Sequence, residues 1–158
     1  VALNIEALNH ATANIPAEQL RIHVCWGNYE GPHHYDVPLA DMIDLVFKVR
    51  ATYISFEAAN PRHEHEYHLF ECVKLPDGKV LCPGVITHAS NIVEHPEWIA
   101  ERLLRFASLV GRENVMAGAD CGFSSQALYK TEVHPTVVWA KFKAMRAGAD
   151  IASNRLWK

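Results

Sequence analysis

The segment Arg21-Ile-His-Val-Cys-Trp-Gly-Asn28 shows the pattern on which the rest of the chain is built. A short apolar, β-branched and aromatic run predicts a buried strand, and the Gly-Asn pair predicts its end. The pattern returns in Tyr53-Ile-Ser-Phe-Glu57 and in residues 114–122, which end in Asp-Cys-Gly. If these strands are parallel, four reactive side chains leave the sheet at one edge: His23, Cys25, Glu57 and Cys121.

Helical and extended patterns alternate along the chain. Strands are predicted over residues 21–26, 52–58, 79–86 and 114–119, and helices over residues 2–12, 39–49, 64–73, 95–110 and 135–152. This alternation predicts the α/β class, with a parallel sheet covered by helices through right-handed crossovers. Four βα units make half of a (β/α)8 TIM barrel. A four-strand arc has two open edges and an uncovered inner face, so we expect something to complete it.

Length and composition predict one globular domain over residues 1–158. The chain is 49% hydrophobic and 21% charged, its formal net charge is −3, and no cluster of Lys or Arg occurs. Nucleic acids and anionic membranes are therefore unfavourable partners. No apolar run reaches the roughly 18 residues of a membrane span, and the start lacks a signal-peptide pattern. Four cysteines could form two disulfides, but the chain is not small and cysteine-dense, and two of the four lie in a metal-like pattern. The cysteines therefore predict a reducing, cytoplasmic environment.

One imidazole, two thiols and one carboxylate match the ligands that zinc accepts in proteins. Taken singly, each is weak, because a half-buried His23 and inert Cys25 and Cys121 are common structural residues. A carboxylate that ends an apolar strand is costly unless it is paired or binds a metal, and Arg62 is the alternative partner of Glu57. As a set on three strand ends, the four residues predict a zinc site.

Other side chains near the strand ends have open assignments. The histidines at positions 63, 65 and 68 are predicted to lie on a solvated face, whereas His33 and His34 follow the first strand and can reach over the pocket. His88, just past the third strand, is a candidate proton donor or a structural residue. Asn28 can orient a metal ligand or cap a turn. The remaining cysteines, Cys72 and Cys82, are expected to be small core residues.

These motifs resemble the C-terminal catalytic domain of the cobalamin-independent methionine synthase family. The similarity is carried, in this order, by His23-Val-Cys25, Glu57 with Asn60-Pro-Arg62, Gly84-Val-Ile86 and Asp120-Cys-Gly122. Details such as Cys-Trp-Gly-Asn are similar to its single-barrel branch, which includes epoxyalkane:coenzyme M transferase-like proteins. The resemblance implies a (β/α)8 barrel like that of uroporphyrinogen decarboxylase, and zinc held by His23, Cys25, Glu57 and Cys121.

The chain departs from the family in two places. Thr87 stands where the family often has Asp, and His88 is shifted by one position from the family histidine that assists proton transfer. The acidic residues that bind the substrate amino group in the family would precede Val1. We therefore expect this chain to be the second half of a barrel whose first half is missing, to be completed by that half or by oligomerisation.

The resemblance implies an enzyme, a methyltransferase of methionine biosynthesis. Zinc deprotonates a coordinated thiol, so a homocysteine-like thiol can accept a methyl group from a methylfolate-type donor. The alternative within the same chemistry is alkyl transfer or epoxide opening by a thiol such as coenzyme M. The alternative of another class is a non-catalytic, zinc-stabilised half-barrel subunit. By itself the chain is expected to be inactive.

Overall fold

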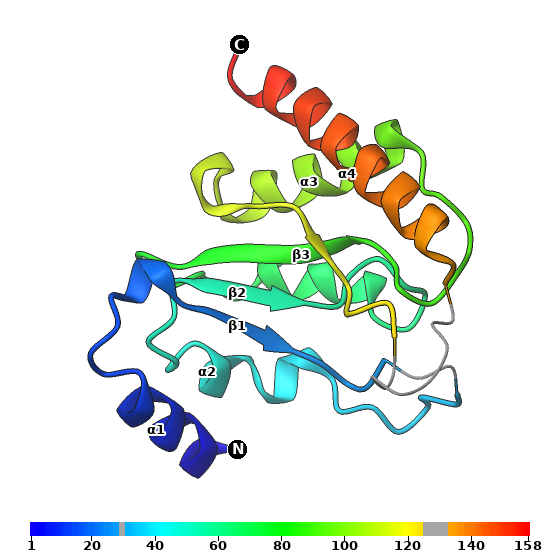
Figure 1. Cartoon of the computed structure of the whole chain (residues 1–158). Coiled ribbons are helices and arrows are strands. Elements are labelled where there is room, and N and C mark those ends of the chain that lie inside the picture. Colours follow the sequence, from blue (N-terminus) through cyan, green and yellow to red (C-terminus); the bar gives the residue numbers. More distant parts are fainter. Residues whose placement is uncertain (29–30, 125–132) are drawn as a thin grey trace.

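The computed structural model describes residues 1–28, 31–124 and 133–158. Its centre is a parallel sheet in the order β1-β2-β3-β4 (Figure 1). The strands are β1 (Arg21–Val24), β2 (Tyr53–Phe56), β3 (Val80–Ile86) and β4 (Gly118–Ala119). Parallel strands place their carboxyl ends at one edge, and the predicted half-barrel of the α/β class is confirmed.

Helical segments separate the strands. The α-helices are α1 (Ala2–Ala11), α2 (Ile43–Val46), α3 (Pro96–Val110) and α4 (Pro135–Leu156). Four 3-10 segments accompany them: η1 (Ala17–Gln19), η2 (Leu39–Asp41), η3 (Glu64–Glu71) and η4 (Arg112–Asn114). Both long helices begin with a His-Pro pair, in which the histidine ring accepts a hydrogen bond from the main-chain N–H two residues later. The proline lacks an N–H that the first turn could not use.

Several predicted elements differ from the observed ones. The helix predicted over residues 39–49 is divided into the 3-10 segment η2 and the four-residue helix α2. The helix predicted over residues 64–73 is the 3-10 segment η3, in which Phe70 is the one buried residue, so no apolar stripe stabilises a longer α-helix. The strand predicted over residues 114–119 is shortened to β4, because η4 occupies its start and the ladder with β3 shifts register between Gly84 and Ile86. Helix α4 continues beyond position 152, to Leu156.

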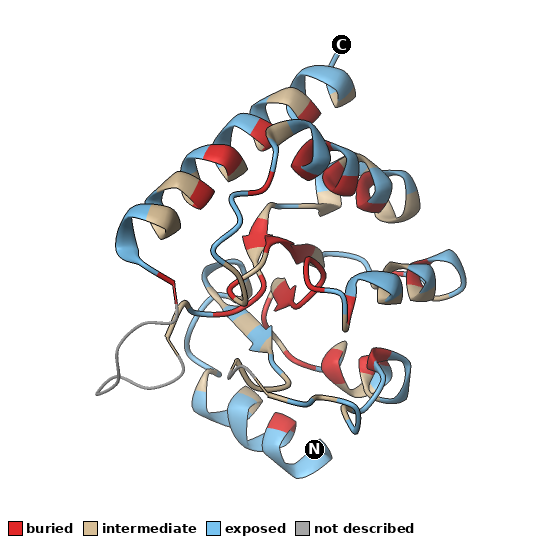
Figure 2. Cartoon of the chain, turned by 90° about the vertical axis from the view of Figure 1, so that its right-hand side faces the viewer, coloured by how far each residue is buried: buried red, intermediate tan, exposed pale blue. Residues whose placement is uncertain are grey.

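The apolar core lies between the sheet and its helices. Side chains of β1 alternate, so that Ile22 and Val24 pack toward the core while Arg21 and His23 are exposed on the opposite, inner face. Figure 2, with the strand ends toward the viewer, shows the helices in an arc around the outside of the sheet. No helix in the described part of the chain combines the length and apolar character of a membrane span.

Candidate metal centre

The four predicted ligands come together at the carboxyl ends of β1, β2 and β4. The Cys121 sulfur lies at their centre, 3.2 Å from His23 Nε2, 3.2 Å from Cys25 Sγ and 3.4 Å from Glu57 Oε1. Residues that are 64 to 98 positions from Cys121 in the sequence thus meet at one point. The parallel arrangement of the strands brings them there.

The spacing of three of these donors fits a metal ion, whereas Glu57 belongs to a second group, with His88 and Cys121. The ligand atoms of His23, Cys25 and Cys121 lie within 4.8 Å of one another. Zinc bonds of about 2.0–2.3 Å hold tetrahedral ligand atoms about 3.5–3.8 Å apart. The observed contacts of 3.2–3.4 Å therefore need only a small outward movement of the sulfur atoms to admit an ion of this size.

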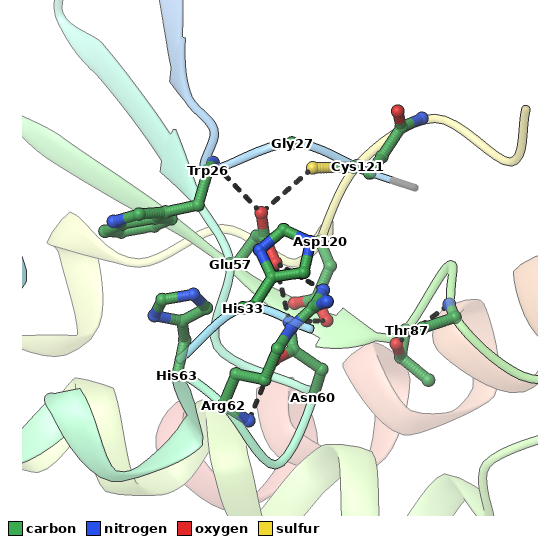
Figure 3. Close-up of polar contacts among 12 residues, drawn as sticks. Trp26, Gly27, His33, Glu57, Asn60, Arg62, His63, Thr87, Asp120 and Cys121 are labelled. Carbon is green, nitrogen blue, oxygen red and sulfur yellow. Dashed lines mark hydrogen bonds and ion pairs between the residues drawn. The ribbon is translucent and has the colours of Figure 1, made fainter. Parts of the chain in front are cut away.

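Glu57 is fully buried and its two oxygens have different partners. Oε1 faces the thiol of Cys121 and accepts a hydrogen bond from the Trp26 main-chain N–H at 3.3 Å. Oε2 accepts from Asn60 Nδ2 at 2.8 Å and pairs with the Arg62 guanidinium at 3.4 Å (Figure 3). The ion pair with Arg62, weighed as the alternative to metal binding, is present without removing Oε1 from the centre.

His23 is oriented by its second ring nitrogen. Nδ1 lies 3.0 Å from Ser55 Oγ on the neighbouring strand, which directs Nε2 toward Cys121. Partial burial of the ring lowers the pKa of His23, more than the nearby Glu57 carboxylate raises it. A lowered pKa keeps the imidazole neutral, which is the form that binds metals.

The pKa of the Cys121 thiol is shifted upward, in the opposite direction to that of His23. Burial raises the pKa of Cys121 well above its ordinary value, and contacts with Cys25 and Glu57 raise it further. Without a cation at the centre, this sulfur therefore keeps its proton at neutral pH. A metal ion must displace that proton in order to bind.

Asp120 is a functional residue that the sequence analysis did not single out as part of the site. Its carboxylate is fully buried and accepts hydrogen bonds from the main-chain N–H groups of Ala58 and Ala59, both at 2.8 Å, and from Asn60 Nδ2 at 2.9 Å. A Cβ at Gly84 would meet Asp120 Oδ1 at 1.9 Å, so only glycine leaves room for it. The available signal was an acidic residue directly before Cys121 at the end of an apolar run.

Asn28 holds the other side of the Cys121 loop. Its amide nitrogen donates to the carbonyl oxygens of Gly122 at 3.1 Å and Ser124 at 2.9 Å. The side chain therefore orients the segment that carries a predicted ligand, one of the two roles expected for it.

His88 lies on the β3 side of the same centre. Its ring is buried, and it forms a second group with Glu57 and Cys121 in which the ligand atoms lie within 4.8 Å of one another. The loop that carries it is fixed by Glu94, whose carboxylate accepts from the Thr87 main-chain N–H at 2.8 Å and pairs with the fully buried Lys141 of α4 at 2.9 Å.

A second polar cluster lies behind the centre and corrects a prediction. His63, expected on a solvated face, is buried and stacks on Trp26 with ring centroids 4.1 Å apart. Its two nitrogens lie 3.1 Å from carboxylate oxygens of Asp36 and Glu66, and Asp36 also pairs with His33. The helical spacing of the histidines hid this role, because two of the partners of His63, Trp26 and Asp36, lie about 30 residues earlier in the sequence. The histidines at positions 65 and 68 are exposed as predicted.

The two remaining cysteines differ in burial. Cys82 is buried in β3, as predicted, whereas Cys72 is exposed just after η3, so its prediction as a core residue is wrong. The short 3-10 segment does not turn position 72 toward the core. Neither cysteine belongs to the groups of metal-binding side chains found among the described residues.

A hollow on the inner face of the sheet adjoins the centre. Its volume is about 370 Å³, and its lining includes Arg21, His23, Ser55, Cys121, Phe142 and Met145. The centre is therefore open toward this hollow, which side chains of β1, β2 and α4 line.

Comparison with known proteins agrees with this architecture. No protein-family model matches the chain. It is 26% identical, over an alignment of 143 residues, to 2-hydroxypropyl-CoM lyase of Xanthobacter autotrophicus (strain ATCC BAA-1158 / Py2), with 75% of this chain and 38% of the lyase covered. Its fold is similar to a B12-independent methionine synthase from Shewanella sp. W3-18-1, solved in complex with selenomethionine. The TM-score is 0.73 at 23% identity, and 97% of this chain and 43% of the synthase chain are covered.

The chain thus spans less than half the length of either protein. Both matched proteins carry the names of enzymes. The match to the lyase in sequence and to the synthase in fold confirms the predicted resemblance. This chain is therefore similar in sequence to a 2-hydroxypropyl-CoM lyase and in fold to a B12-independent methionine synthase.

Proposed function

We propose that this chain is the metal-binding half of a zinc-dependent S-methyltransferase. Its substrates are a homocysteine-like thiol and a methylfolate-type methyl donor. The observation that carries the proposal is the meeting of His23, Cys25, Glu57 and Cys121, from three strand ends, at 3.2–3.4 Å around one sulfur. Two sulfur donors and one imidazole favour zinc over magnesium or calcium, which prefer oxygen.

Zinc bound at this centre would hold an incoming thiol as its thiolate at neutral pH, where a free thiol with a pKa near 8.5 is mostly protonated. The chain supplies the remaining parts. Asn60 and Arg62 hold Glu57 through Oε2, so Oε1 can give up its place beside Cys121 without releasing the carboxylate. His88 lies close enough to the centre to protonate a leaving group, and we propose it as the general acid.

A second candidate function uses the same centre. The sequence relative is a 2-hydroxypropyl-CoM lyase, which supports alkyl transfer or epoxide opening by a thiol such as coenzyme M. The two reactions differ in the electrophile and in the group that the thiol carries. A non-catalytic subunit with a structural zinc is the candidate of another class, and the open hollow beside the centre argues against it, because structural zinc sites are closed.

We also propose that residues 1–158 act as the second half of a (β/α)8 barrel. The inner face of the sheet is exposed at Arg21 and His23, and β1 and β4 are edge strands. Four further βα units, from the same polypeptide or from an associated subunit, would cover that face and complete the substrate pocket. A cytoplasmic location is proposed with this role.

The metal content tests the centre directly. Purified chain is expected to bind about one zinc ion, and Cys121→Ser is expected to abolish binding, because Cys121 contacts each of the other three ligands. Cys72→Ser is the matched control, since Cys72 is exposed and lies outside the centre. Full zinc content in the Cys121 variant would contradict the proposed metal site.

The reaction is tested on a protein that contains this chain together with four complementary βα units. Homocysteine with a methylfolate, and coenzyme M with an epoxide, are offered separately, and product formation is followed with and without zinc. Methylation of homocysteine supports the first proposal, and consumption of the epoxide supports the second. Zinc binding with neither reaction supports the non-catalytic subunit.

A further inference from the structure

The centre contains one more metal-binding group than the predicted site uses. The ligand atoms of Glu57, His88 and Cys121 lie within 4.8 Å of one another, and all three residues are buried. The three atoms are an oxygen, a nitrogen and a sulfur, which together suit zinc. This group shares Cys121 with the group formed by His23 and Cys25, and it lies on the β3 side of that sulfur.

We propose that His88 is a fifth metal-binding side chain of the centre. With Glu57 and Cys121 it forms a second metal position, next to the position that His23 and Cys25 complete on the β1 side. Three protein ligands are the usual number in a catalytic zinc site and leave a place for an exogenous ligand. The contact of 3.4 Å between Cys121 Sγ and Glu57 Oε1 is close to the separation of about 3.5 Å expected for two ligands of one tetrahedral zinc ion.

Hydrogen bonds and an ion pair hold the residues around this second position in place. Glu94 fixes the main chain next to His88 through the Thr87 N–H, and Lys141 neutralises Glu94 inside the protein. Asn60 holds the second oxygen of Glu57 at 2.8 Å. Because these groups are held before a metal arrives, binding costs little conformational entropy.

The second position bears on the proton transfer proposed for His88. A ring nitrogen that binds a metal cannot donate a proton, so we place this position in the state without substrate. Arrival of the substrate thiol at the β1 side would then free the ring for acid catalysis. The inference depends on the metal centre of the proposed function but not on the identity of the transferred group.

Zinc affinity in the absence of substrate tests the proposal. In the double variant His23→Ala/Cys25→Ser, the β1-side ligands are removed, and both positions are exposed, so the fold should be retained. We expect this variant to bind one zinc ion, more weakly than the wild type in competition with a chelator. Adding His88→Phe, which keeps a ring but removes its nitrogens, should weaken zinc binding at least tenfold. Adding His65→Phe, at an exposed histidine outside the centre, should not.

A direct measurement covers the case in which His88→Phe disturbs folding. In the double variant loaded with ¹¹³Cd, a coupling between the metal and the ¹⁵N-labelled ring of His88 is expected. Absence of this coupling overturns the proposal, as does equal zinc affinity with and without the His88 nitrogens in folded protein. If Cys121→Ser leaves zinc binding intact in the otherwise unaltered chain, the metal centre of the proposed function is contradicted. That outcome is distinct from a failure of the His88 proposal alone.

Discussion

Asn60 donates a hydrogen bond to Asp120 across 60 positions of sequence, and the two side-chain atoms lie 2.9 Å apart in the buried interior. Because the same Asn60 nitrogen also lies 2.8 Å from Glu57, this contact links the strand end that carries Glu57 to the strand end that carries Cys121. Two of the four proposed ligands thus have their separation set by a pair of residues that do not themselves belong to the centre.

Replacement of Asp120 by Asn should weaken metal binding. An Asn side chain can accept from the N–H groups of Ala58 and Ala59, but its NH₂ group would face the NH₂ group of Asn60. The loop after Glu57 would then shift relative to Cys121. Loss of such an outer contact typically lowers metal affinity about 10–100-fold, and we expect a change of this size in a chelator competition assay. Asp150→Asn, on the exposed face of α4, is the control, and equal affinities of the two variants would contradict the role of Asp120.

Replacement of Lys141 by Met should destabilise the protein strongly. The change leaves the carboxylate of Glu94 buried without its cation, and loss of one partner of a buried ion pair costs about 3–5 kcal/mol. The free energy of unfolding, measured by urea denaturation, should fall by about this amount. Adding Glu94→Gln should recover part of the loss, because the uncompensated charge is removed while an acceptor for Thr87 is kept.

The control for Lys141 is a pair on the same helix. Arg146 and Asp150 form an ion pair on the surface of α4, with side chains 80% and 56% exposed. Arg146→Met should leave the free energy of unfolding nearly unchanged, since exposed pairs contribute little. A loss as large as that of Lys141→Met would mean that burial of the ion pair is not what matters.

The charge of His63 should make stability depend on pH. Burial lowers the pKa of His63, but hydrogen bonds and charge from Glu66, with Glu57 and Asp36, outweigh it, so the pKa is raised above its ordinary value. The stability from this group is therefore complete below the unfolded-state pKa of about 6.5 and is lost as pH rises through the higher folded-state value. The stability difference between wild type and His63→Gln should shrink as pH rises above about 6.5. A constant or growing difference, measured by urea unfolding at several pH values, would contradict this assignment.

Zinc affinity should rise with pH. The raised pKa of Cys121 means that metal binding displaces a proton from this thiol at neutral pH, and burial is the main cause. Each proton displaced makes the affinity increase up to about tenfold per pH unit. Chelator competition between pH 6 and about 8.5, where thiols ordinarily begin to ionise, measures the slope. An affinity that does not change with pH would show that Cys121 is already a thiolate before the metal binds.

The candidate site could be predicted because its ligands follow strands. An apolar run ending in Glu57, and another ending in Cys121, show in the sequence where reactive side chains emerge. The residues around the metal ligands were harder to predict from the sequence. His63 lies in a histidine-rich segment that has the composition of a solvated surface, and its burial depends on Trp26 and Asp36, which lie on a loop about 30 residues earlier. Cys72 is exposed because the predicted helix that would bury it forms as a 3-10 segment.

Patterns in the amino-acid sequence were enough to predict the alternation of strands and helices, the parallel sheet and the edge at which His23, Cys25, Glu57 and Cys121 emerge. Local periodicity and strand-end chemistry contain that information. The residues that hold the centre in place became visible in the folded chain alone: Asp120 links the ends of β2 and β4, and Lys141 holds Glu94 beside the loop of His88. Their hydrogen bonds and ion pairs join segments that lie 47 to 62 positions apart, and no local pattern predicts the distance between two such segments.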